Sequence, residues 1–166
     1  MAAQSYKEGD WFAVPMPHGF AVGLVARQPK RGPVILGYFF GPLRKQLPDE
    51  AELTQIKAEQ ASLICRLKDG ALHRGLWRVM GHHHHWRRKD WPSPAFLRRE
   101  GLSGRAIRLE YDGDNLTTPA REKEASIPDL SLPEDVVLDE SRVLDTLGKL
   151  LAEQKPVTID PSHWVR

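Results

Sequence analysis

Four consecutive histidines, residues 82–85, are the most conspicuous residues of this sequence that could do chemistry. A flexible segment of imidazoles can chelate a divalent metal ion. A native metal site, however, draws its ligands from distant parts of the chain and orients them through further hydrogen bonds. Adjacent side chains of an extended segment point to opposite sides, so at most two of the four could face one ion. We therefore expect this histidine run to lie on an exposed loop between a strand at 77–80 and Trp91, with no dedicated metal site and no cofactor.

The sequence offers no pattern for nucleophilic catalysis. Cys65 is the single cysteine and lies in an apolar stretch, where a thiol is buried and unreactive. One cysteine also excludes an internal disulfide framework and a zinc site built from cysteines. The chain contains no Gly-x-Ser-x-Gly, no glycine-rich phosphate loop and no His-Glu-x-x-His. We expect a protein that is not an enzyme.

Basic residues at 87–89 and 98–99 flank three aromatic residues, Trp86, Trp91 and Phe96. Basic groups interleaved with aromatic rings suit single-stranded nucleic acid, whose phosphates they attract and whose bases they stack. In the alternative interpretation, the aromatic rings anchor a long loop and the arginines remain solvated. The prolines that follow Trp91 favour this alternative, because they make the segment a rigid packing device. Nucleic acid is therefore the less favoured partner.

The net charge of +2 conceals a strong asymmetry along the chain. Residues 1–109 contain 18 basic and 9 acidic residues, whereas residues 110–145 contain 3 basic and 11 acidic ones. The two parts could neutralise each other within the fold. They could also present an acidic face to a basic partner and steer its approach.

Short apolar segments separated by glycine and proline predict the elements that must position these residues. They indicate strands at 11–14, 20–26, 34–40, 63–67, 77–80 and 106–111, with irregular segments at 82–105 and 115–127. Two helices are predicted, one at 49–60 behind an Asp49 cap and one at 140–153, whose Leu144, Leu147 and Leu151 should pack on the sheet. This pattern favours a mainly β (α+β) fold, in which five to seven strands form a strongly bent antiparallel sheet or a small, partly open barrel.

Length and composition fit a single globular domain over residues 1–166, with a core at about 6–151 and a tail at 155–166. Hydrophobic residues make up 40% and charged residues 28%, which is ordinary for a folded domain. No apolar run approaches the roughly 20 residues of a membrane helix, and residues 1–10 lack the apolar stretch of a signal peptide. We expect a cytoplasmic protein of bacterial type with no membrane partner.

Several segments of the chain, taken in order, resemble the bacterial immunity protein 26 family. The segment Gly-Asp-Trp-Phe-Ala-Val-Pro at 9–15 is similar to the family's opening G-D-x-F-x-[IV]-P. Residues 76–81 and 91–96 resemble its G-x-W-x-V-I-G and W-P-x-P-x-F stretches, and 23–25 and 36–40 resemble its second and third strands. The histidine- and arginine-rich segment before Trp91 departs from the more acidic linker expected there. The likeness covers about residues 6–151, and its motif positions are Asp10, Phe12, Pro15, Gly37, Phe39, Trp77, Gly81, Trp91, Pro92, Pro94 and Phe96.

This resemblance implies a non-enzymatic antidote that binds a cognate polymorphic toxin made beside it. It supplies no catalytic residues. If the toxin is a nuclease with a cationic cleft, the expected contacts are the acidic residues Asp112, Asp114, Glu134, Asp135, Asp139 and Glu140. Otherwise the aromatic loop with Trp86 and Trp91 is the expected contact. The alternative function is that of a small β-barrel that binds nucleic acid through the basic N-terminal half, and the oligomeric state stays open.

Overall fold

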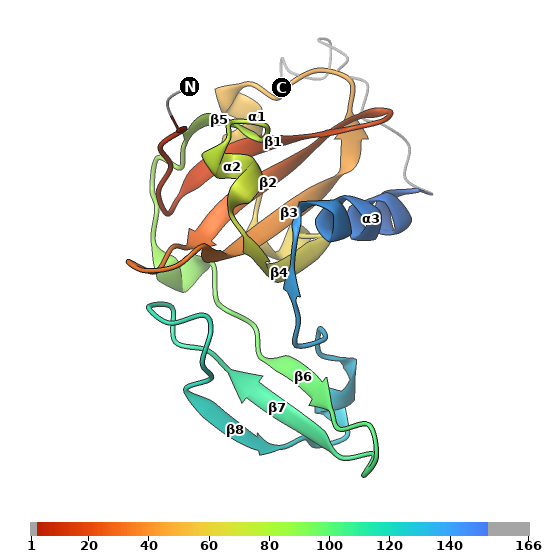
Figure 1. Ribbon diagram of the computed structural model, residues 1–166. Coiled ribbons are helices and arrows are strands. Elements are labelled where there is room, and N and C mark those ends of the chain that lie inside the picture. The colour runs from red at the N-terminus through yellow and green to blue at the C-terminus, as the bar shows by residue number, and fades with distance from the viewer. Residues whose placement is uncertain (1–2, 153–166) are drawn as a thin grey trace.

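Two β-sheets organise the protein in its computed structural model, which describes residues 3–152 (Figure 1). The larger sheet has the order β5-β1-β2-β3-β4-β9 and the smaller one has the order β6-β7-β8. Neighbouring strands are antiparallel except β4 and β9, which are parallel. The strands are β1 (Asp10–Met16), β2 (Gly19–Arg27), β3 (Val34–Arg44), β4 (Leu63–Lys68), β5 (Arg78–His82), β6 (Phe96–Arg99), β7 (Ala106–Glu110), β8 (Arg121–Glu124) and β9 (Val137–Leu138).

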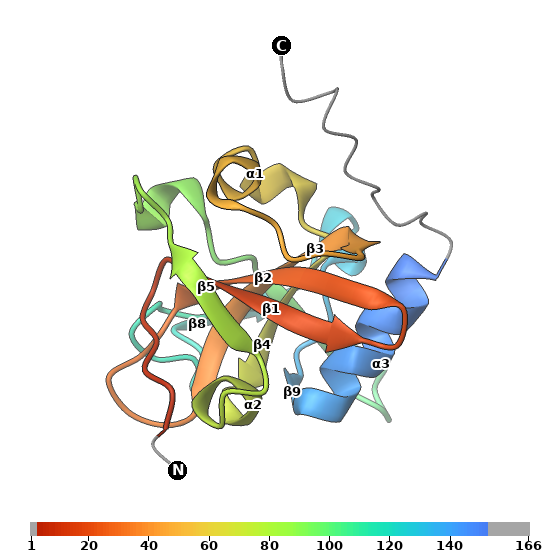
Figure 2. The ribbon, with the colours of Figure 1, turned by 90° about the horizontal axis from the view of Figure 1, so that it is seen from above.

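Helices cover both faces of the larger sheet. They are α1 (Glu50–Thr54), α2 (Gly70–His73) and α3 (Glu140–Leu151), and short 3-10 turns occupy Ala58–Gln60, Arg88–Asp90 and Pro128–Ser131. Figure 2 shows α1 on one side of the larger sheet and α2 and α3 on the other. Within residues 3–152, no helix has the length and apolar character needed to cross a membrane.

The larger sheet is buried on both faces, because the two sets of alternate side chains each pack into a hydrophobic core. In β3, Leu36 and Tyr38 enter the first core, and Ile35 and Phe39 enter the second. This explains why the strands read as continuous apolar runs. The first core lies between the larger sheet, α1 and the smaller sheet, with Trp11, Leu53, Trp91, Phe96 and Leu109 among its members. The second core lies under α2 and α3, with Phe12, Leu67, Leu72, Trp77, Val143, Leu147 and Leu151 among its members.

Two strand glycines make room for this packing. Gly23 lies opposite Phe12 on β1, and a Cβ there would meet the Phe12 ring at 2.2 Å. At Gly37 a Cβ would lie 2.9 Å from Leu67 Cδ2 and 3.0 Å from the Phe39 ring. A glycine at either position therefore lets a large side chain lie directly over the strand backbone.

The structure confirms the mainly β fold class and the C-terminal helix packed on the sheet. In α3, Val143, Leu147 and Leu151 are buried in the second core, and Leu144 packs against its margin. The expected end of this helix at residue 153, and the tail at 155–166, lie outside the described residues.

Three expectations about single elements were wrong. The helix expected at 49–60 ends at Thr54 and is followed by a 3-10 turn, which still brings Leu53 and Ile56 into the first core. The segment expected to be irregular at 82–105 contains β6, and the loop expected at 115–127 contains β8. β8 shows no apolar pattern because its four side chains are all exposed and it is held by backbone pairing to β7.

Candidate functional site

The six acidic residues expected to contact a partner do not form one acidic face. Asp114 pairs with Arg88 at 3.2 Å, and Glu140 pairs with Arg74 at 2.7 Å. Asp139 caps α3 by accepting a hydrogen bond from the backbone N–H of Arg142, and Asp112 and Glu134 are exposed. The acidic part of the chain is therefore largely neutralised by the basic part within the fold.

Asp135 has a structural role in the fold. Its carboxylate lies 2.5 Å from Nη2 of Arg66, whose side chain is 4% exposed, and it accepts a hydrogen bond from the Tyr111 hydroxyl at 2.6 Å. The Arg66 guanidinium also donates to the backbone oxygen of Leu116 and lies 4.0 Å from the Tyr111 ring centroid. Burial, together with the bond to Asp135, raises the pKa of Tyr111 to about 12. The Asp135 side chain is only 11% exposed, and its role as a partner contact stays a prediction.

Trp91 is likewise a core anchor, with 3% of its surface exposed. Its ring makes edge contacts with Trp11 and Tyr38, at centroid distances of 5.8 and 5.2 Å. This burial agrees with the interpretation that Trp91 holds down the long loop, and its role as a partner contact stays a prediction. Trp86 stacks on Trp91 at 6.2 Å and remains partly exposed, so it stays a candidate contact.

The basic residues near these rings do not form a nucleic-acid platform. Arg87 pairs with Asp90 at 3.0 Å, Arg88 pairs with Glu8 at 2.7 Å, and Arg98 pairs with Glu122 at 3.4 Å. Trp91 and Phe96 are buried, so no base could stack on them. Of the three rings, Trp86 alone remains partly exposed.

Most positions of the family motifs serve the fold. Phe12, Phe39 and Trp77 pack together in the second core, with centroid distances of 5.7 to 6.0 Å. The carbonyl of Pro92 accepts a hydrogen bond from the Tyr38 hydroxyl. The remaining positions include buried Asp10, Gly37 and Phe96, partly buried Gly81 and Pro94, and exposed Pro15.

The histidine run has four different environments. His82 is the last residue of β5, and its Nδ1 lies 2.9 Å from Oδ1 of buried Asp10, so the expectation of a loop was wrong for this residue. His83 stacks on Trp11 at 5.8 Å, and its Nδ1 accepts a hydrogen bond from the backbone N–H of His85. Burial and the neighbouring imidazoles lower the pKa of His83. His84 contacts the Glu50 carboxylate, and His85 is exposed.

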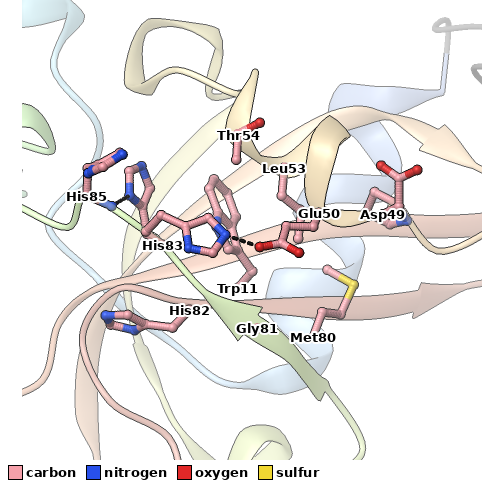
Figure 3. A pocket seen from close by; sticks show the side chains of 12 residues that line it. Trp11, Asp49, Glu50, Leu53, Thr54, Met80, Gly81, His82, His83 and His85 are labelled. Carbon is pink, nitrogen blue, oxygen red and sulfur yellow. Dashed lines mark hydrogen bonds and ion pairs between the residues drawn. The ribbon is translucent and has the colours of Figure 1, made fainter. Parts of the chain in front are cut away.

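A pocket of about 410 Å³ separates the histidine run from α1, and we call it the histidine pocket. Its apolar floor includes Trp11, Leu53 and Met80. Figure 3 shows Glu50 reaching from α1 toward the imidazoles across this space. The other lining residues are Pro48, Asp49, Thr54, Gly81 and the four histidines.

The polar groups that line the histidine pocket are carboxylates, imidazoles and one hydroxyl. Its charged lining residues are the carboxylates Asp49 and Glu50, and its lining includes no lysine, arginine, serine or cysteine. The Thr54 hydroxyl donates to the backbone oxygen of Ala51, and Cys65 lies elsewhere in the core, where burial raises its pKa to about 12. No group of three histidine, cysteine, aspartate or glutamate side chains in residues 3–152 could hold a metal ion.

The sequence did not identify Asp49 and Glu50 as site residues. The capping pattern predicted that Asp49 accepts a hydrogen bond at the start of α1, and it does so from the backbone N–H of Glu52. That pattern places both carboxylates at an exposed helix start. Glu50 and His84 are 34 residues apart, and no spacing of residues in the sequence predicts that they are in contact.

Comparison with known proteins gives one match. The family model described as Immunity protein 26 matches residues 7–107, which is more than half of the chain. No curated protein and no solved structure matches it. The matched part runs from just before β1 to the start of β7, and it includes every residue that lines the histidine pocket.

Proposed function

Because the chain belongs to the immunity protein 26 family, we propose that it binds and neutralises a cognate polymorphic toxin in the bacterial cytoplasm, without catalysing a reaction. The family match over residues 7–107 is the observation that carries this proposal. The candidate site supports it, because the histidine pocket combines an apolar floor with two carboxylates.

The fold suits a protein that inhibits by binding. A sheet whose two faces are both buried holds its loops in fixed positions, so little ordering is required when a partner docks. A stable complex needs about 800 Å² of contact on each side, with a few residues carrying most of the binding free energy. The histidine pocket and the adjoining Trp86 provide a concave apolar centre for such a contact.

Co-expression with the toxic C-terminal domain encoded next to this gene tests the proposal. We expect the chain to restore growth of cells that make the toxin domain, and to copurify with it as a stoichiometric complex. A toxin domain from an unrelated system serves as the specificity control and should not be neutralised.

Two results would contradict the proposal. One is cell death despite soluble expression of both proteins. The other is rescue without a complex, accompanied by a covalent change in the toxin or its target, which would indicate an enzyme.

A further inference from the structure

We propose that the histidine pocket receives a lysine or arginine side chain of the toxin, with Glu50 as its counter-ion. This inference rests on the proposed function and names the surface and the chemistry of the contact. A long cationic side chain has an apolar stem and a charged head, and the pocket offers both environments.

The pocket matches such a side chain in shape and in charge. Trp11, Leu53 and Met80 form an apolar floor that can cover the methylene stem. The Glu50 carboxylate, whose side chain is 73% exposed, stands at the rim where the charged head would lie. Asp49 adds a second carboxylate on the same rim. The pocket is thus a negatively charged hollow within the most basic part of the sequence.

In the structure, the His84 imidazole lies where the charged head of that side chain would bind. Its Nε2 contacts Oε1 of Glu50 and so links the histidine run to α1 across the pocket (Figure 3). A neutral imidazole is a weaker partner for a carboxylate than a lysine or arginine is. An incoming cation can therefore displace His84 without leaving Glu50 unpaired.

The groups around the pocket make this contact sensitive to pH. Asp49 and Glu50 face it from the start of α1, the four imidazoles face it from the end of β5 and the segment that follows, and Asp10 pairs with His82 from β1. Histidine changes its charge between about pH 5 and pH 8. Burial and the neighbouring imidazoles hold the pKa of His83 below its ordinary value, so acidification below about pH 6.5 adds positive charge to the pocket lining and should repel a cationic side chain.

Titration calorimetry with the purified, inactivated toxin domain tests the inference at pH 7.5. Glu50→Gln removes the counter-ion and should weaken binding about tenfold. Thr54→Arg places a tethered cation at the rim and should weaken binding about a hundredfold or more, because it competes for the same carboxylate. Thr54 is exposed, so we expect the variant to keep the melting temperature of the wild type.

Matched controls come from the same stretch of chain. Glu59→Gln removes an exposed carboxylate that does not line the pocket, and Gln55→Arg adds a cation at the residue next to Thr54. Both should bind the toxin within about twofold of the wild type. Wild-type binding should also weaken as the pH is lowered from 7.5 to 5.5, and less so in His83→Gln.

The outcomes separate the two proposals. A wild-type chain that does not bind the toxin domain overturns the proposed function. A wild-type chain that binds, with Glu50→Gln and Thr54→Arg binding equally well, overturns the pocket assignment alone. Binding that strengthens on acidification would also overturn it, because the occupant would then be an anionic side chain.

Discussion

Replacing Asp135 by alanine should destabilise the protein strongly, because it leaves a buried guanidinium without its counter-charge. Arg66 is 4% exposed and lies on β4 of the larger sheet. Its guanidinium packs against the ring of Tyr111, the residue that follows β7. Without Asp135, its remaining hydrogen bond in the structure is the one to the backbone oxygen of Leu116, at 2.8 Å. The Tyr111 hydroxyl loses its acceptor at the same time.

The expected loss follows from this geometry. Removing one partner of a buried ion pair typically costs about 3–5 kcal/mol. For a protein of this length, about 2–4 °C of melting temperature accompanies each kcal/mol, so the melting temperature should fall by about 6–20 °C. Asp135→Asn keeps an acceptor for Arg66 but loses the charge, and we expect it to cost less than Asp135→Ala, because the guanidinium keeps a hydrogen-bond partner.

Urea denaturation followed by tryptophan fluorescence measures these changes. Glu134→Ala is the matched control, because Glu134 is the exposed neighbour, and it should change the stability by less than about 0.5 kcal/mol. The double variant Arg66→Met with Asp135→Leu should recover most of the loss, since it removes both charges. If Asp135→Ala is as stable as Glu134→Ala, the buried pair does not hold the two sheets together and the reasoning is refuted.

Three further predictions concern the histidine run and the second core. Burial lowers the pKa of His83 below its ordinary value of 6.5, so the folded state binds the proton less tightly than the unfolded state and stability should fall as the pH drops below about 6.5. Melting curves at pH 7.5 and 5.5 should show a smaller fall for His83→Gln than for the wild type. His82→Ser should lower stability by about 1–2 kcal/mol, because Asp10 loses its side-chain partner, whereas exposed His85→Ser should be neutral by the same denaturation assay. Leu147→Ala should cost about 2–5 kcal/mol, because Leu147 lies on the buried face of α3 and is fully buried, and an unchanged denaturation midpoint would contradict its place in the core.

The elements that the sequence predicted best are those with a strong hydrophobic pattern. The strands β1 to β4 were recognised because their side chains are buried on both faces and therefore form apolar runs. By contrast, β8 exposes all four of its side chains, and β9 has only two residues, so neither leaves a hydrophobic signature. The division into two sheets depends on backbone pairings between segments that are far apart in the sequence. Amino-acid composition does not predict such pairings.

The candidate site was harder to predict than the fold, because it depends on pairs of residues far apart in sequence. Asp135 and Arg66 are separated by 69 residues. A count of charges along the chain therefore gave no sign that the Asp135 carboxylate pairs with Arg66 inside the fold. The histidine run was considered as a metal site and was expected to hold no dedicated one. Its position in the structure depends on contacts with Asp10 and Glu50, which the spacing of the histidines does not predict. Trp91 was weighed as a contact and as an anchor, and its prolines favoured the anchor.

The late position of β9 and α3 in the chain has a consequence for biosynthesis. β4 is made some 70 residues before β9, its parallel partner, and the second core stays open until α3 supplies Val143, Leu147 and Leu151. At ordinary translation rates, β4 waits roughly 4–14 seconds for that partner to be synthesised. A ribosome-bound chain therefore exposes one apolar face of its larger sheet, and it completes its core only after residue 151 has been added.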